Sequence, residues 1–151
     1  MNVQPIGWVR SPRTEPDDGG WDAITSTITL DSTAFGAEAL MGLDDFSHIE
    51  VVFVFDRVDP NAVTTSSQPP RENLAWPEVG IFAQRGSSRP NRLGVSVCRL
   101  ESVEGITLTV RGLDAIDKTP VLDIKPYLVA FGARGEVRQP GWAHEVTSRY
   151  W

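Results

Sequence analysis

The stretch Ile24-Thr25-Ser26-Thr27-Ile28-Thr29-Leu30 alternates apolar and polar side chains, and most of its residues are β-branched. Successive side chains of a β-strand point to opposite faces, so this alternation predicts a strand with one buried face. The run at 49–55 is nearly all apolar, which predicts a strand buried on both faces. Further strand signals lie on either side, at residues 5–12, 95–103, 106–110 and 121–127.

Helical signals are short by comparison. Ser32 or Thr33 can cap a helix over residues 34–41, and the tail from Arg134 on favours a terminal helix that docks its aromatic side chains. Strands that do not alternate with long helices argue against a doubly wound parallel sheet. We therefore predict a mainly β fold, a small and mostly antiparallel β-barrel with one or two short peripheral helices.

Composition narrows the function classes. The chain has 151 residues, which fits one domain, and its formal net charge of −6 disfavours a general nucleic-acid binder. There is no apolar run near the roughly 20 residues of a membrane span, and no signal-peptide pattern opens the chain, so we expect no membrane association and a cytoplasmic location. The single cysteine, Cys98, excludes an internal disulfide, and His48 and His144 are too far apart to suggest a metal site.

The stretch Gly80–Ser96 uses far more turn residues than the about two to five of a plain hairpin. Arg85, Arg89 and Arg92 all lie within it, which predicts a pocket wall for an anionic or strongly polar ligand. A solvated, arginine-rich surface loop is the alternative. The preceding segment, residues 59–77, has little periodicity, so it is either disordered or a functional loop such as a lid.

Four segments together resemble the TsaA/TrmO-type (YaeB-like) family: Phe46–Ile49, Gly80–Arg85, Arg89–Ser96 and Leu113–Tyr127. Members of that family depend on S-adenosylmethionine, and the best understood ones methylate N6 of threonylcarbamoyl-adenosine beside the tRNA anticodon. The resemblance also implies a small β-barrel and a homodimer that binds the cofactor near the subunit interface. It implies no metal.

The resemblance carries over site residues position by position. It implies cofactor contacts from Arg85, Val95, Asp56, Arg57, Ala115, Ile116, Asp117, Lys118, Gly19, Gly20 and Trp21. Arg89, Asn91 and Arg92 are expected to face a substrate or a partner subunit, although Asn91 can equally cap the turn through its side chain. No catalytic base can be named; Asp56, Asp123 and Tyr127 are candidates by chemistry and location, and an Asp123–Lys125 ion pair on the sheet is the alternative for Asp123.

The chain departs from the family pattern at Gln84, Arg92 and Lys118, where Thr, Pro and Gly are usual or frequent. Bacterial tRNA-modifying members carry an additional C-terminal domain that we do not find here. We therefore keep as the alternative an S-adenosylmethionine-binding protein, or a methyltransferase that acts on a small molecule. Residues 1–130 are expected to form the barrel domain, and residues 131–151 a tail that packs on it or on the dimer partner.

Overall fold

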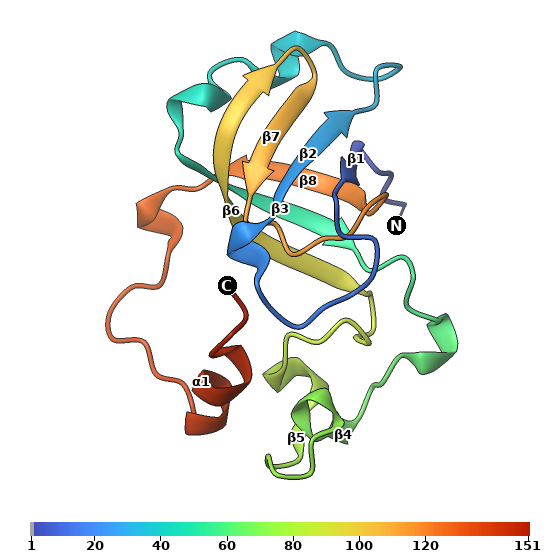
Figure 1. Ribbon diagram of the computed structural model, residues 1–151, viewed down its shortest axis with the longest axis vertical. Coiled ribbons are helices and arrows are strands. Elements are labelled where there is room, and N and C mark those ends of the chain that lie inside the picture. Colours follow the sequence, from blue (N-terminus) through green and yellow to red (C-terminus); the bar gives the residue numbers. More distant parts are fainter. Residues whose placement is uncertain (1) are drawn as a thin grey trace.

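A computed structural model describes residues 2–151, and within them six strands close into a barrel (Figure 1). All pairs are antiparallel, in the order β1–β2–β7–β6–β3–β8. The mainly β, antiparallel barrel predicted from the sequence is thus confirmed. The strands are β1 (Gly7–Arg10), β2 (Thr25–Leu30), β3 (His48–Val54), β6 (Leu93–Glu104), β7 (Thr107–Arg111) and β8 (Pro120–Pro126).

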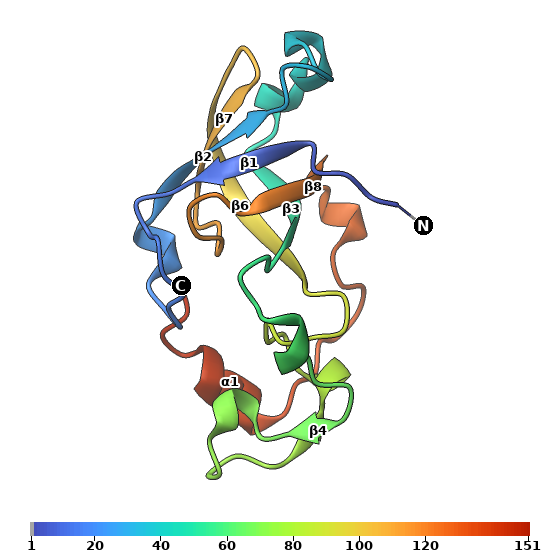
Figure 2. The ribbon, with the colours of Figure 1, turned by 90° about the vertical axis from the view of Figure 1, so that its right-hand side faces the viewer.

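A second group of elements lies beyond one end of the barrel, where the long β3–β6 connection and the C-terminal α1 (Gly141–Thr147) lie side by side (Figures 1 and 2). The indole Nε1 of Trp76 donates to Glu145 of α1 over 2.8 Å and joins the two. The predicted terminal helix is confirmed. The connection holds η4 (Pro60–Ala62), β4 (Ser67–Gln68), η5 (Pro70–Glu72), β5 (Val79–Gly80) and η6 (Ile81–Ala83), so the region around 59–77 has more local structure than its sequence predicted.

The helix predicted over residues 34–41 is wrong. Gly36 takes an extended conformation (φ −100°, ψ 178°), which ends any helix begun before it, and only the 3₁₀ turns η2 (Ala37–Leu40) and η3 (Leu43–Asp45) follow. Asp31, rather than Ser32 or Thr33, accepts the hydrogen bond from the backbone N–H of Thr33 at 2.9 Å. The remaining 3₁₀ turns are η1 (Trp21–Ala23) and η7 (Val129–Phe131).

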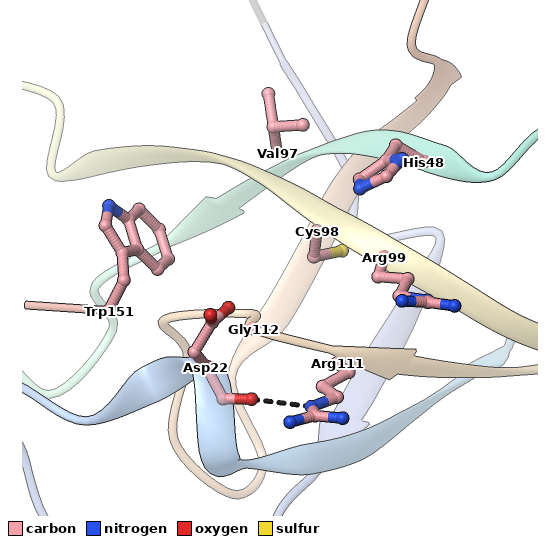
Figure 3. A pocket seen from close by; sticks show the side chains of 8 residues that line it. All are labelled: Asp22, His48, Val97, Cys98, Arg99, Arg111, Gly112 and Trp151. Atoms are coloured by element: carbon pink, nitrogen blue, oxygen red, sulfur yellow. Dashed lines mark hydrogen bonds between the residues drawn. The ribbon is translucent and has the colours of Figure 1, made fainter.

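Strand β3 is buried on one face only, contrary to the prediction for residues 49–55. Ile49, Val51 and Phe53 point into the barrel, whereas Val52 and Val54 are half-buried on its outside. The reason is topological, because a closed barrel encloses just one face of each strand. On the outer face, His48, Arg99 and Arg111 lie on the neighbouring strands β3, β6 and β7 (Figure 3).

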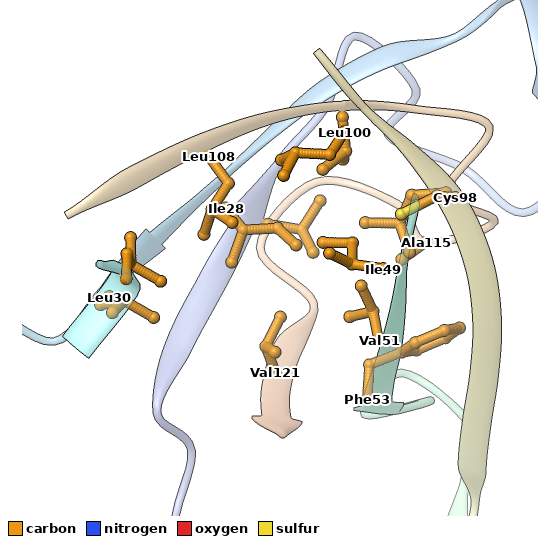
Figure 4. Packing of buried hydrophobic residues seen from close by; sticks show 14 residues of the cluster. Ile28, Leu30, Ile49, Val51, Phe53, Cys98, Leu100, Leu108, Ala115 and Val121 are labelled. Atoms are coloured by element: carbon orange, nitrogen blue, oxygen red, sulfur yellow. The ribbon is translucent and has the colours of Figure 1, made fainter. Parts of the chain in front are cut away.

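The barrel interior is filled by aliphatic side chains from every strand (Figure 4). Ile28, Val51 and Leu108 are fully buried, and burial of each such side chain stabilises the fold by about 1.5–3 kcal/mol. Gly94 of β6 lies against the ring of Phe53, and an added Cβ would overlap the ring carbons. A side chain at position 94 therefore has no room. None of the helices over residues 2–151 is long and apolar enough to cross a bilayer.

Candidate functional site

Segments from distant parts of the sequence meet at the end of the barrel that faces α1. Arg57, three residues after the end of β3, joins two of them: its Nη1 donates to the carbonyl of Thr14 over 2.6 Å and its Nη2 to the carbonyl of Asp117 over 3.4 Å. The carboxylate of Glu15 lies 3.6 Å from Nη1. The structure thus brings together Arg57 and Asp117, two residues that the sequence assigned to one site.

The loop before β8 carries the predicted contacts Ala115–Lys118. The backbone N–H of Asp117 donates to the backbone carbonyl of Arg13 (2.8 Å), and that of Lys118 donates to the backbone carbonyl of Val9 (2.7 Å). The Asp117 carboxylate accepts from the backbone N–H of Ser11 at 3.1 Å. These internal bonds hold the loop in place, so a ligand would have to use the amides of Ala115 and Ile116.

The turn Gly19–Trp21 lies next to that loop. Gly20 adopts a left-handed conformation (φ 68°), which glycine takes without the steric cost of a Cβ. The Arg13 guanidinium lies 4.2 Å from the ring centroid of Trp21 and donates to the carbonyl of Gly19 over 2.8 Å. Trp21 is buried, and its Nε1 has no hydrogen-bond partner among the described residues. A buried indole N–H without a partner is costly, and a ligand carbonyl or ring nitrogen could satisfy it.

The end of the tail closes over this turn. The backbone N–H groups of Gly20 and Trp21 donate to the carbonyls of Arg149 (3.1 Å) and Tyr150 (3.2 Å). The Tyr150 hydroxyl donates to Oδ2 of Asp114 over 2.6 Å, and Oδ1 of Asp114 is buried without a partner.

Burial, together with the Asp114 charge, raises the pKa of Tyr150, whereas the charge of Arg85 opposes this shift. Sequence reasoning missed both Asp114 and Tyr150 as site residues. Asp114 lies inside a segment that resembled the family, whereas nothing local marked Tyr150.

Arg85 contacts Val95, a second residue that the resemblance assigned to the cofactor: its Nη2 donates to the carbonyl of Val95 over 2.7 Å. The other two arginines of the 80–96 stretch bind backbone carbonyls, Arg89 within the stretch and Arg92 in the segment that follows β3. Arg89 donates to the carbonyl of Gln84 (3.0 Å) and Arg92 to that of Val58 (2.9 Å). A backbone bond from Arg92 to the Arg89 carbonyl closes the turn, so the structure does not need Asn91 as a side-chain cap.

The three candidate bases are not brought together. Asp56 is exposed two residues after the end of β3, while the backbone N–H of Tyr127 donates to the carbonyl of His48 at the opposite end of that strand. Asp123 forms an ion pair with Lys125 on the outer face of β8. The register places Asp123 opposite Val52 and Val52 opposite Val95, so Asp123 lies two strands, about 10 Å, from Val95.

The charged, polar and apolar groups at this end of the barrel fit S-adenosylmethionine. Arg85 can bind a carboxylate, and the unpartnered oxygen of Asp114 can accept from an ammonium group or lie near a sulfonium. Outward-facing Val95, 44% exposed, suits an apolar face of the adenine ring. No group of three or more His, Cys, Asp or Glu side chains over residues 2–151 is arranged to hold a metal ion.

The chain is similar to known proteins over most of its length. A human tRNA (adenine(37)-N6)-methyltransferase is 41% identical over 102 residues, which is 68% of this chain but only 23% of the human protein. A probable S-adenosyl-L-methionine-binding protein of Pyrococcus abyssi is 35% identical and covers 92% of this chain and 74% of its own length. The crystal structure of TrmO from Pseudomonas aeruginosa superposes with a TM-score of 0.73 at 34% identity, over 91% of this chain and 60% of that one.

The first of these relatives is thus far longer than the part that this chain matches. A family model described as the tRNA-methyltransferase O N-terminal domain matches residues 9–133. That range contains the whole barrel from Val9 on and the loop that carries Asp114. The chain therefore belongs to the tRNA-methyltransferase O N-terminal domain family.

Proposed function

We propose that this chain is an S-adenosylmethionine-dependent methyltransferase whose acceptor is an adenine in tRNA. The observation that carries the proposal is the pairing of Arg85 with Val95 beside the Asp114–Tyr150 pair, at the end of the barrel where the predicted cofactor loops meet. The names of the human relative and of the matching family model, both tRNA methyltransferases, support the same activity. By analogy with the family, the finer proposal is N6-methylation of threonylcarbamoyl-adenosine next to the anticodon.

The chemistry places two demands on the protein. The cofactor supplies a methyl group on a good leaving group, so the protein mainly has to align it with the acceptor nitrogen. Arg85 and Asp114 would hold opposite charges of the cofactor and so set its direction. A weakly nucleophilic nitrogen must also lose a proton, and a carboxylate is the simplest acceptor for it. Asp123 shares the outer face with Val95 and is better placed for this role than Tyr127, with Asp56 as the second candidate.

The outer face of β6 supports the proposal of a homodimer. Leu93 is 38% exposed and adjoins the half-buried Val54 of β3, and Val52 extends this apolar surface to the edge of Val95. Such an apolar stripe next to the proposed cofactor site is what a second copy would cover. The division into a barrel over 1–130 and a packed tail over 131–151 is part of the same proposal, and the cytoplasmic location remains a prediction.

The name of the P. abyssi relative supports a second candidate, a protein that binds S-adenosylmethionine and acts on a small molecule or on none. The two candidates share the cofactor site and differ in the acceptor. Mass spectrometry of tRNA nucleosides after incubation with protein and cofactor separates them, because only the first predicts a methylated adenosine.

Calorimetric titration with S-adenosylmethionine tests the shared site. Arg85→Ala removes a charge-assisted hydrogen bond worth about 1.5–3 kcal/mol, so we expect affinity to fall about 10- to 150-fold. Arg138→Ala changes an exposed arginine of the tail and serves as the control. Parent-like binding by Arg85→Ala, with both variants folded, would refute the assignment of Arg85.

A further inference from the structure

A row of three nitrogen-bearing side chains crosses the outer face of the barrel. His48 on β3 pairs in register with Arg99 on β6, and Arg99 pairs with Arg111 on β7. All three side chains are exposed and project to the same side (Figure 3). Like charges directly opposite each other destabilise a sheet, so folding alone does not favour Arg99 beside Arg111.

Neighbouring carboxylates offset this charge only in part. The Nε of Arg99 lies 3.3 Å from the carboxylate of Glu101. The Nε of Arg111 donates instead to the backbone carbonyl of Asp22 over 2.7 Å, and this bond positions the Arg111 guanidinium without an ion pair. The Asp22 carboxylate borders the same hollow near Gly112. The terminal nitrogens of both arginines thus remain available to an anion that arrives from solvent.

The row and Trp151 line one hollow of about 350 Å³, with Cys98 in its lining (Figure 3). Trp151 is 55% exposed, and its ring packs edge-on against Tyr150 with the centroids 5.1 Å apart. Ligand pockets for small molecules begin at about 300 Å³, so the hollow suits one nucleotide rather than a duplex. An exposed aromatic ring beside arginines is how proteins bind single-stranded RNA, by base stacking together with phosphate contacts.

The hollow adjoins the candidate cofactor site along two routes. Val97 lines the hollow and lies two residues after Val95 on the same face of β6, about 7 Å away. Trp151 directly follows Tyr150, which bonds to Asp114. A base held against Trp151 would therefore lie next to the groups that we assign to the methyl donor.

We propose that His48, Arg99, Arg111 and Trp151 form the subsite that receives the single-stranded RNA segment carrying the acceptor adenine. Arg99 and Arg111 bind the phosphates, and Trp151 stacks on a base. This subsite rests on the proposed function, since it places an RNA acceptor beside the cofactor. It also explains how a chain with a net charge of −6 can bind a polyanion, through a local basic row instead of an overall positive surface.

The test measures RNA and cofactor binding separately on the full chain. The probe is a fluorescein-labelled RNA stem–loop copied from a tRNA anticodon arm, followed by anisotropy over a range of salt concentrations. For the double variant Arg99→Gln/Arg111→Gln we expect at least tenfold weaker RNA binding. We also expect a salt slope that is smaller by about 1.4–1.8, from the loss of two phosphate contacts. Trp151→Ala should weaken binding at least fivefold with the slope unchanged.

Controls keep misfolding apart from lost contacts. Arg99→Lys/Arg111→Lys retains both charges and should keep the salt slope of the parent, and Arg138→Gln should match the parent throughout. Affinity for S-adenosylmethionine should stay within about twofold for the double Gln variant, which also reports an intact fold.

Three outcomes overturn the proposal in distinguishable ways. If the double Gln variant binds and methylates RNA like the parent, the subsite is wrong and the proposed function stands. If the parent elutes as a dimer on size exclusion and that variant as a monomer, while the RNA affinity is unchanged, the row is an interface between copies. If the parent binds neither the cofactor nor RNA, the proposed function fails and the subsite fails with it.

Discussion

The Tyr150–Asp114 hydrogen bond makes a sharp prediction for the substitution Tyr150→Phe. The hydroxyl donates to Oδ2 of Asp114 over 2.6 Å in a half-buried setting, and the other carboxylate oxygen is buried without a partner. The change removes one oxygen atom and leaves the ring, with its edge-on contact to Trp151, in place. It therefore isolates the hydrogen bond from the packing of the tail.

The magnitude follows from the charge of the acceptor. A hydrogen bond to a charged group contributes about 1.5–3 kcal/mol, and here its loss leaves a carboxylate with a second unsatisfied oxygen. For a chain of this length each kcal/mol shifts the melting temperature by about 2–4 °C. We expect Tyr150→Phe to lower the melting temperature by about 3–12 °C near neutral pH.

The pH dependence gives an independent check. The folded protein raises the pKa of Tyr150, chiefly through burial and then through the Asp114 charge. The stabilisation by this group is therefore complete below the unfolded pKa of about 10 and is lost as the pH rises through the higher folded pKa. The difference in stability between parent and Tyr150→Phe should be constant from pH 7 to 9 and shrink in more alkaline solution.

Differential scanning calorimetry over this pH range measures both effects. Tyr127→Phe is the matched control, because Tyr127 is also half-buried and its hydroxyl has no hydrogen-bond partner within residues 2–151. A loss for Tyr150→Phe no larger than that for Tyr127→Phe would refute the reasoning. A difference that grows with alkaline pH would refute it as well.

Two further predictions concern the barrel. Burial, with a smaller contribution from the Asp114 charge, raises the pKa of the Cys98 thiol from 9.0 to about 12, so it should react with Ellman's reagent far more slowly in the folded chain than in urea. Because the folded state raises this pKa, Cys98 should contribute about 4 kcal/mol to the free energy of unfolding below pH 9, and this contribution should be lost between pH 9 and 12. Urea unfolding of the parent and of Cys98→Ala at each pH measures the loss. Gly94→Ala would push a methyl group into the Phe53 ring and should destabilise the fold by about 1–3 kcal/mol. Gly86 has open space around it, so Gly86→Ala should change the stability little. Equal melting temperatures for the two variants would contradict this account.

Much of the barrel could be predicted because strand periodicity is a local property. The alternation at Thr25–Leu30 states which side chains face inward, and the structure confirms it. Along β6 the sequence predicted a strand but not its inward face: Val95 and Val97 face outward, and Ser96 is buried. The prediction failed where burial depends on the rest of the molecule. The outer side chains of β3 are apolar, yet the barrel covers only its inner face, and no local pattern reveals whether another surface will cover the outer one.

The candidate site was only partly open to the same reasoning. Resemblance named Arg57, Asp117, Arg85 and Val95, and the structure puts them in contact as two pairs. Tyr150 was expected only as an aromatic residue that docks the tail, because nothing in the local sequence assigns such a residue to a site. Its partner Asp114 lies 36 residues earlier, and only the docked tail brings the two together.

By itself, the sequence determined the class of fold, the inward face of β2 and the family. Each of these depends on residues that are close in the chain or on motifs preserved in order. The tertiary structure alone decided that the tail closes over Gly20 and Trp21, and that His48, Arg99 and Arg111 stand in one row. The register between strands and the docking of the tail depend on contacts between residues far apart in the chain, and such contacts exist only once the barrel has closed.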